Sequence, residues 1–212
     1  MELCKLFYEC AYKGGWTTIN NVDFKFIEHD NTLEIHFMGS SQFSDWIFNF
    51  FFPKKLYKMF KVHRGFYHCY SQVRSIILDK IYKDVDKYKE IIIVGYSHGS
   101  ALTIISHEDI GYHFPNIKVR SYAFESPRPL KVKKKYKHLW NGLTRIVNGN
   151  DIVCHLPPRI FGFSDVGNEI KIKGDTSLVD KCLPKCIKSH FPNVVYDGLK
   201  KFEQEKMLNG GK

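Results

Sequence analysis

The stretch "EIIIVGYSHGSALTII", residues 90–105, decides the fold. Residues 90–94 are dominated by β-branched apolar side chains, a composition typical of a parallel strand that is covered on both faces. A helical pattern follows directly after Ser97. A serine between two glycines at such a junction indicates a tight turn, in which backbone passes close to backbone and the serine hydroxyl is lifted above the edge of a sheet.

Strands and helices alternate along the rest of the chain. An antiparallel hairpin is expected over residues 21–39, and a helix over residues 65–89, where apolar residues recur at helical spacing. Further strands are expected at 117–124, 143–148 and 168–174, and a last helix at about 190–205. This alternation predicts an α/β fold with a mostly parallel central sheet, an antiparallel N-terminal hairpin and helices on both faces.

The composition is that of a globular protein. The chain has 212 residues, of which 43% are hydrophobic, and we expect one domain over residues 1–212. No apolar segment approaches the roughly 18–20 residues of a membrane-spanning helix. Residues 1–16 lack the pattern of a secretory signal and instead predict an amphipathic helix ended by Gly14 and Gly15. With scattered cysteines expected as free thiols, these features predict a cytoplasmic location.

The chain is basic, with a formal net charge of +10. Such a charge favours anionic partners. The densest cluster is "KVKKKYKHLW", residues 131–140, which is either a solvated loop or a peripheral contact with an anionic membrane, because Tyr136 and Trp140 interleave with the lysines. No zinc-finger spacing or RNA-binding aromatic motif accompanies the charge in the sequence, so nucleic acid is not expected as a partner.

Gly95, Ser97 and Gly99 form a G-x-S-x-G motif between a strand and a helix, the context in which hydrolases place a nucleophilic serine. A serine hydroxyl is a poor nucleophile and needs a base, which in turn needs an orienting carboxylate. The N–H groups at the start of the following helix favour a developing oxyanion. The backbone N–H of His98 is therefore a candidate oxyanion donor.

The order serine, acid, histidine that accompanies this motif limits the choice of partners. Asp151 follows a strand directly, in a Gly-Asn loop, and is the preferred acid; Asp165 and Asp175 remain alternatives. Two histidines follow Asp151. His190 opens the last helix after a long loop and is the preferred base. His155 is close to Asp151 along a proline-ended segment and remains an alternative.

Five blocks occur along the chain in a fixed order: "FMGSSQFSDWIFNF" (37–50), "KVHRGFY" (61–67), "VGYSHGSAL" (94–102), "AFESPRP" (123–129) and "RIVNGNDIVCHLPP" (145–158). Together they resemble the class 3 lipases, the fungal-lipase-like α/β hydrolases. The resemblance implies an α/β-hydrolase fold that hydrolyses lipid esters, acylglycerols by family habit, through an acyl-enzyme. It implies the triad Ser97, Asp151 and His190, with no metal and no cofactor.

The same resemblance implies an oxyanion hole and a lid. Ser40 would donate from its backbone N–H and hydroxyl, with the N–H of His98 as the second donor. A candidate lid covers about residues 41–60, and its apolar face would meet lipid. Core packing is the alternative for these aromatic residues, which are Trp46, Phe50, Phe51 and Phe52.

The sequence departs from the family at several positions. Met38 and Asn49 stand where the family has arginine and aspartate; Ser100 and Glu125 replace glycines, and we expect neither of these two to touch the chemistry. The departures at Met38 and Asn49 leave open a catalytically inactive member that binds lipid or a protein partner. The net charge of +10 leaves open a phospholipase A-type activity on anionic membranes.

The spacing of Cys182, Cys186 and His190 would align all three on one helix and raises the question of a metal site. Pro184 interrupts that helix, and a fourth ligand is not evident in the sequence. We therefore expect no metal at this site.

Overall fold

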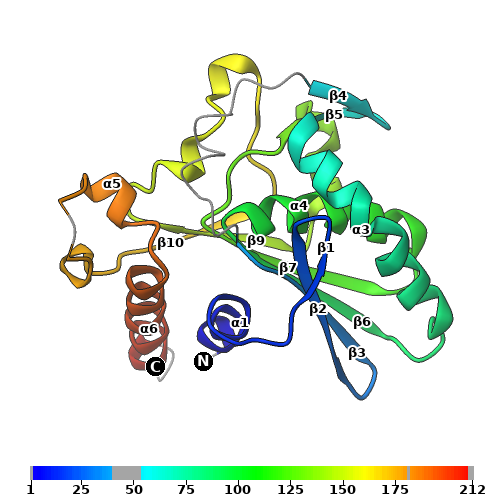
Figure 1. Cartoon of the computed structure of the whole chain (residues 1–212), viewed down its shortest axis with the longest axis horizontal. Coiled ribbons are helices and arrows are strands. Elements are labelled where there is room, and N and C mark those ends of the chain that lie inside the picture. Colours follow the sequence, from blue (N-terminus) through cyan, green and yellow to red (C-terminus); the bar gives the residue numbers. More distant parts are fainter. Residues whose placement is uncertain (1, 40–53, 181, 210–212) are drawn as a thin grey trace.

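The computed structural model describes residues 2–39, 54–180 and 182–209 (Figure 1). Its main sheet has seven strands in the order β1-β2-β3-β6-β7-β9-β10. Strands β1, β2 and β3 pair antiparallel, and every pair from β3 to β10 is parallel. The predicted α/β fold with an antiparallel start is confirmed. The strands are β1 (Thr17–Ile19), β2 (Val22–His29), β3 (Thr32–Phe37), β6 (Glu90–Tyr96), β7 (Lys118–Phe124), β9 (Leu143–Asn148) and β10 (Asn168–Ile172).

Helices cover both faces of this sheet (Figure 1). Helices α3 (Arg64–Lys83) and α4 (His98–His113) pack on one face, where Ile91 and Ile93 of β6 join their apolar cluster. Helices α1 (Glu2–Ala11) and α6 (Pro192–Asn209) pack together on the other face, against Ile92 and Val94. Alternate side chains of β6 thus enter two cores, which explains its continuous apolar sequence.

The first and last helices are also joined by hydrogen bonds. The Glu203 carboxylate on α6 accepts the backbone N–H groups of Leu3, at 2.8 Å, and Cys4, at 3.3 Å. N–H groups in the first turn of a helix have no acceptor within their own helix. Glu203 therefore caps α1 from the opposite end of the chain.

The predicted helix over 65–89 is shorter in the structure, where α3 ends at Lys83. Its apolar stripe is fully buried and runs through Tyr70, Val73, Ile77 and Ile81. Beyond that stripe Val85 is exposed. The helix ends where it no longer has an apolar face to bury.

A second, small sheet was not expected from the sequence. It contains β4 (Lys54–Tyr57), β5 (Phe60–His63) and β8 (Leu130–Lys131), in the order β4-β5-β8. The Tyr57 hydroxyl donates to Asp109 of α4 at 2.6 Å. Residues 54–60 of the candidate lid are thus part of the packed structure, while residues 40–53 lie outside the described residues.

The basic segment 131–140 is a 3-10 helix over Lys134–Trp140 rather than an open loop. Trp140 is fully buried, and its indole N–H donates to the Ile104 carbonyl at 2.8 Å. The prediction that Trp140 interleaves with lysines at a membrane is therefore wrong. The indole belongs to the core, whereas the lysines and His138 are exposed and Tyr136 is half-buried.

Among the described residues, no helix is both long enough and apolar enough to cross a membrane.

Candidate active site

Ser97 occupies the turn between β6 and α4 and has φ 54° and ψ −120°. This positive φ is disfavoured for a residue with a side chain and persists only where the surroundings enforce it. The two flanking glycines permit the turn. A Cβ on Gly95 would overlap the Gly99 carbonyl, and a Cβ on Gly99 would overlap the Phe37 carbonyl. The glycines are required because the backbone of the elbow contacts itself and the neighbouring strand β3.

The structure brings Ser97, His190 and Asp151 together in one hydrogen-bonded line. His190 Nε2 lies 2.8 Å from Ser97 Oγ, and its Nδ1 lies 2.5 Å from Asp151 Oδ2. The other Asp151 oxygen accepts the Val153 backbone N–H at 3.0 Å. A carboxylate only accepts hydrogen bonds, so Nδ1 carries the ring hydrogen and Nε2 is free to take the serine proton.

The three side chains come from separate elements. Ser97 follows β6, and Asp151 follows β9, two strands away in the sheet. His190 lies in the turn between α5 (Lys185–Lys188) and α6, rather than in the last helix itself. Asn148, at the end of β9, donates its amide to the Ser189 carbonyl at 2.7 Å. This bond fixes the loop that carries His190 to the edge of the sheet.

Tyr96 supports the imidazole from beneath. Its ring stacks on that of His190, with centroids 5.3 Å apart and an interplanar angle of 22°. Its hydroxyl donates to the His190 backbone carbonyl. Burial, together with the nearby carboxylate of Asp151, holds the pKa of Tyr96 well above its ordinary value. The hydroxyl therefore stays protonated and remains a donor.

The alternative partners lie elsewhere. His155 is exposed, and its Nδ1 lies 3.3 Å from Arg128 Nη2. Asp165 is bonded to arginine side chains, and Asp175 accepts the Ser177 N–H at the start of a short 3-10 turn. Neither acid makes a hydrogen bond with His190 in the described part of the chain.

Of the predicted oxyanion and lid residues that were named individually, the structure describes His98. His98 is the first residue of α4, so its backbone N–H belongs to the first turn, where no acceptor is available within the helix. Burial lowers the pKa of the His98 side chain to about 4, which keeps it neutral at neutral pH. Residues outside the described part of the chain are Ser40, Trp46, Phe50, Phe51 and Phe52.

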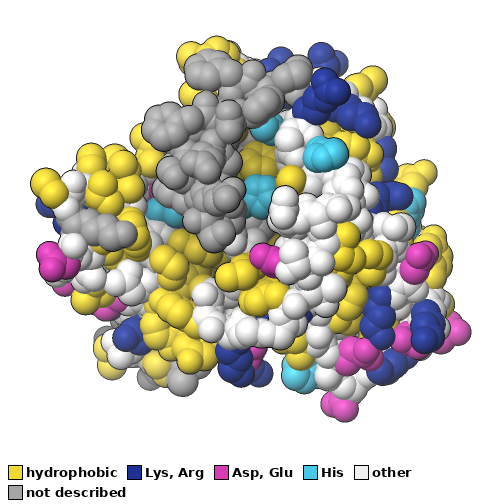
Figure 2. All heavy atoms as spheres, in the orientation of Figure 1, with side chains coloured by type: hydrophobic (Ala, Val, Ile, Leu, Met, Phe, Trp, Pro, Cys, Tyr) yellow, Lys and Arg dark blue, Asp and Glu magenta, His cyan; other side chains and the backbone are white. Residues whose placement is uncertain are grey.

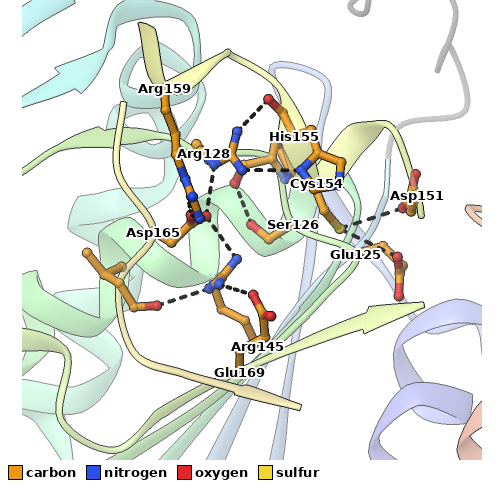
Figure 3. Close-up of polar contacts among 12 residues, drawn as sticks. Glu125, Ser126, Arg128, Arg145, Asp151, Cys154, His155, Arg159, Asp165 and Glu169 are labelled. Atoms are coloured by element: carbon orange, nitrogen blue, oxygen red, sulfur yellow. Dashed lines mark hydrogen bonds and ion pairs between the residues drawn. The ribbon is translucent and has the colours of Figure 1, made fainter. Parts of the chain in front are cut away.

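The expectation that Glu125 lies away from the chemistry is wrong. Ser100 meets only the backbone of the nucleophile, because its hydroxyl donates to the backbone carbonyl of Ser97. Glu125 follows β7 and is fully buried beside the triad acid (Figure 3). Between them, the Cys154 thiol lies 3.5 Å from Glu125 Oε2 and 3.7 Å from Asp151 Oδ2. One indication of a role for Glu125 was present in the sequence, because the residue directly follows β7, the strand that pairs with β6.

Glu125, Asp151 and Cys154 place three potential metal-ligand atoms within 4.8 Å of one another. One of these acids already accepts from His190, so a cation there would compete with the triad hydrogen bond. Cys182 and Cys186 are free thiols, and within the described residues neither belongs to such a group.

A serine on a strand-turn-helix elbow, with its histidine and acid at the same edge of a parallel sheet, defines a serine hydrolase site on an α/β-hydrolase fold. The sequence profile of the family described as "Lipase (class 3)" matches residues 35–161. The chain therefore belongs to the class 3 lipase family. His190 lies beyond the matched range.

Relatives and solved structures agree with this family. The chain is 31% identical over 156 residues to a lipase of Rhizomucor miehei, with 67% of this chain and 42% of the relative covered. It is 29% identical over 166 residues to a lipase of Rhizopus niveus, with 73% and 42% covered. The chain thus spans less than half the length of these curated relatives.

The structure of a Rhizomucor miehei lipase propeptide complex covers 86% of this chain and 65% of its own, with a TM-score of 0.63 and 26% identity. A triacylglycerol lipase, described as having a serine protease triad as its catalytic centre, covers 86% of this chain and 76% of its own, again with a TM-score of 0.63 and 26% identity.

Proposed function

We propose that this chain is a serine carboxylester hydrolase that acts on lipid esters, acylglycerols first among them. One observation carries the proposal: Ser97 Oγ, the His190 imidazole and the Asp151 carboxylate form a continuous line of hydrogen bonds of 2.8 Å and 2.5 Å. A serine held in a strained turn opposite a buried His-Asp pair is the arrangement that activates a nucleophile.

The proposed reaction follows from this geometry. Ser97 Oγ attacks the ester carbonyl carbon while His190 Nε2 takes its proton, and Asp151 stabilises the imidazolium that forms. The oxyanion is stabilised by the N–H of His98 and by Ser40. His190 then protonates the departing alkoxide, which leaves an acyl group on Ser97. Water, activated by the same imidazole, releases the fatty acid.

The names of the relatives support the proposed substrate class. One structural relative is described as a triacylglycerol lipase, and relatives from Malassezia globosa are named mono- and diacylglycerol lipases. We therefore place acylglycerols ahead of phospholipids. A phospholipase A-type activity is the second candidate, because a basic surface adjoins the small sheet.

We further propose that the β4–β5 hairpin contacts anionic membranes. Figure 2 shows Lys and Arg side chains gathered at the end of the molecule that carries this hairpin. Lys61 of β5 pairs directly with Lys131 of β8, and burial together with these two charges lowers the pKa of Lys54. Leu56 and Met59 of the same hairpin are 68% and 56% exposed. Cationic and apolar side chains together are what an anionic lipid surface binds.

Vesicle binding tests this contact. The Ser97→Ala protein should bind vesicles that contain an anionic lipid and release them as salt is raised. Replacing Lys55 and Lys61 together by alanine should weaken binding by roughly thirtyfold, because each lysine contributes about 1 kcal/mol. Equal binding to neutral vesicles would contradict the proposal.

The cytoplasmic location is also a proposal. Its support is that the six cysteines are free thiols, whereas Malassezia globosa relatives are named as secreted. Thiol titration of protein isolated from its own cells should find these thiols reduced.

Labelling with a fluorophosphonate probe tests the enzyme proposal. Ser97 should be the modified residue, and both Ser97→Ala and His190→Ala should abolish labelling. Failure of the folded wild-type protein to label, with detergent present, would refute the enzyme proposal and favour an inactive lipid-binding member. Hydrolysis of triacylglycerol and phospholipid emulsions would then separate the two substrate classes.

A further inference from the structure

Glu125 is a buried acid that the proposed mechanism does not use. It follows β7, which lies between the strand that carries Ser97 and the strand that precedes Asp151. Its side chain is fully buried and its φ is 51°. Glycine adopts such a φ readily, whereas glutamate is strained there. A glutamate that strains the backbone beside the triad acid indicates that its side chain has a role at this site.

Among the described residues, no cation forms an ion pair with Glu125 that would balance a second buried carboxylate beside Asp151. Within the described residues, the only ion pair made by Asp151 is with His190, and Glu125 makes none. The groups that face Glu125 are Asp151 and Cys154 from the loop after β9, and Tyr96 from β6. Arg145 acts on Cys154, but its N–H groups are bonded to Val166, Asp165 and Glu169.

Two adjacent buried carboxyl groups cannot both ionise under these conditions. Asp151 accepts the Val153 N–H at 3.0 Å with one oxygen and lies 2.5 Å from His190 Nδ1 with the other, so both of its oxygens serve as acceptors. Glu125 Oε1 receives no N–H or hydroxyl hydrogen bond from the described residues. Burial and the charge of Asp151 raise the pKa of Glu125 well above its ordinary value. The proton of the pair therefore resides on Glu125.

We propose that Glu125 is neutral at neutral pH and donates its carboxyl O–H to the Asp151 carboxylate, which makes it a positioning residue for His190. One oxygen of each carboxyl group lies within 4.8 Å of one oxygen of the other, with the Cys154 thiol beside both groups. An O–H donated by Glu125 would hold the Asp151 carboxylate in the orientation in which Oδ2 faces His190.

A neutral Glu125 also matters for the base. A second negative charge beside Asp151 would favour the imidazolium form of His190, which has no lone pair to accept the Ser97 proton. A protonated carboxyl group gives the triad acid a hydrogen bond without that charge. The positioning role rests on the proposed hydrolase function, whereas the neutral state of Glu125 does not.

Infrared difference spectroscopy tests the neutral state independently of activity. In a Ser97→Ala background at neutral pH, subtraction of Glu125→Gln should reveal the carbonyl band of a protonated carboxylic acid, which shifts in D₂O. Asp165→Asn is the matched control, because its acid is paired with arginines and should contribute no such band. A carboxylate band in place of the acid band would overturn the inference.

Kinetics tests the positioning role. Glu125→Gln keeps a neutral donor, whereas Glu125→Met keeps the volume and removes the donor. We expect Met to lower kcat about tenfold more than Gln does, with KM little changed, since about one hydrogen bond to the triad acid is lost. Equal loss in both variants, with equal melting temperatures, would overturn the positioning role.

Two results separate this inference from the proposed function. An inactive wild-type protein that still shows the acid band retains a neutral Glu125 and refutes only the hydrolase. A stoichiometric metal ion in the purified protein, lost in Glu125→Gln, would make Glu125 a ligand and overturn the inference.

Discussion

Two acidic clusters, one around the buried Asp151 and one around the half-buried Asp165, differ in what surrounds them (Figure 3). Asp165 accepts from Arg128 and Arg145 at 2.9 and 3.1 Å and from Arg159 at 3.0 Å. Asp151 has a histidine, a thiol and a second carboxyl group, and no arginine among its described partners. Asp165 is neutralised by fixed cations, which suits a structural role. Asp151 is left with partners that can exchange protons, which suits a chemical one.

The largest expected effect is at Asp151. Asp151→Asn preserves shape but favours the wrong tautomer of His190, so we expect kcat to fall about 10⁴-fold. The free energy of unfolding should change little by comparison. Single-turnover kinetics and urea unfolding of the same preparation check both parts. If the loss of stability accounts for the loss of activity, Asp151 has a structural role like that of Asp165 and the comparison is wrong.

The opposite result is expected at Asp165. Asp165→Asn removes the anion from three arginines and should lower the free energy of unfolding by about 3 kcal/mol. Because none of these groups contacts Ser97 or His190 in the described structure, kcat of the folded fraction should stay within about twofold of wild type. Urea unfolding and active-site titration measure the two quantities, and a large fall in kcat would contradict a purely structural role.

The two clusters should respond to pH with opposite signs. Burial alone would raise the pKa of Asp165, but Arg145, Arg159 and Arg128 lower it. Its stabilisation is therefore complete above about pH 3.9 and is lost as the pH falls below that value. Burial and Asp151 raise the pKa of Glu125. Unfolding releases its proton, so it lowers stability as the pH rises above about 4.3, by up to about 1.4 kcal/mol per pH unit.

Unfolding of wild type and Glu125→Gln from pH 5 to pH 8 measures this difference. The glutamine variant should lose less stability than wild type over that range, because it has no proton to release. Parallel curves for the two proteins would show that Glu125 ionises in the folded state as it does when unfolded.

The smallest effect is expected at His155, which borders the arginine cluster. His155→Gln should leave kcat within about twofold of wild type, because the ring lies beside Arg128 rather than Ser97. A loss comparable to that of His190→Ala, in a steady-state assay, would transfer the role of base to His155.

The sequence predicts most of the sheet, because the central strand β6 is buried on both faces and carries a continuous apolar run. Residues 143–148 form the predicted strand β9 with the same bounds. The small sheet could not be predicted in this way, because β8 has only two residues and carries no periodicity. Trp140 was misplaced because its lysine neighbours are exposed while its own ring turns inward, which depends on tertiary packing.

In the candidate site, too, some residues could be predicted from the sequence and one could not. Chain order and the ends of strands were enough to select Ser97, Asp151 and His190, which the structure brings within hydrogen-bonding distance. Glu125 could be recognised as a departure from the family but not as a neighbour of Asp151. The direction of its side chain follows from a φ of 51° at the end of β7, and no local sequence pattern encodes that angle.

The Glu203 cap on α1 has a consequence for how the protein is made. Leu3 and its acceptor are 200 positions apart, and Ser97 and His190 are 93 positions apart. Contacts this distant form slowly and only after most of the chain has left the ribosome. During synthesis the serine elbow is therefore complete long before its base arrives, so under the proposed mechanism a growing chain has no activated nucleophile.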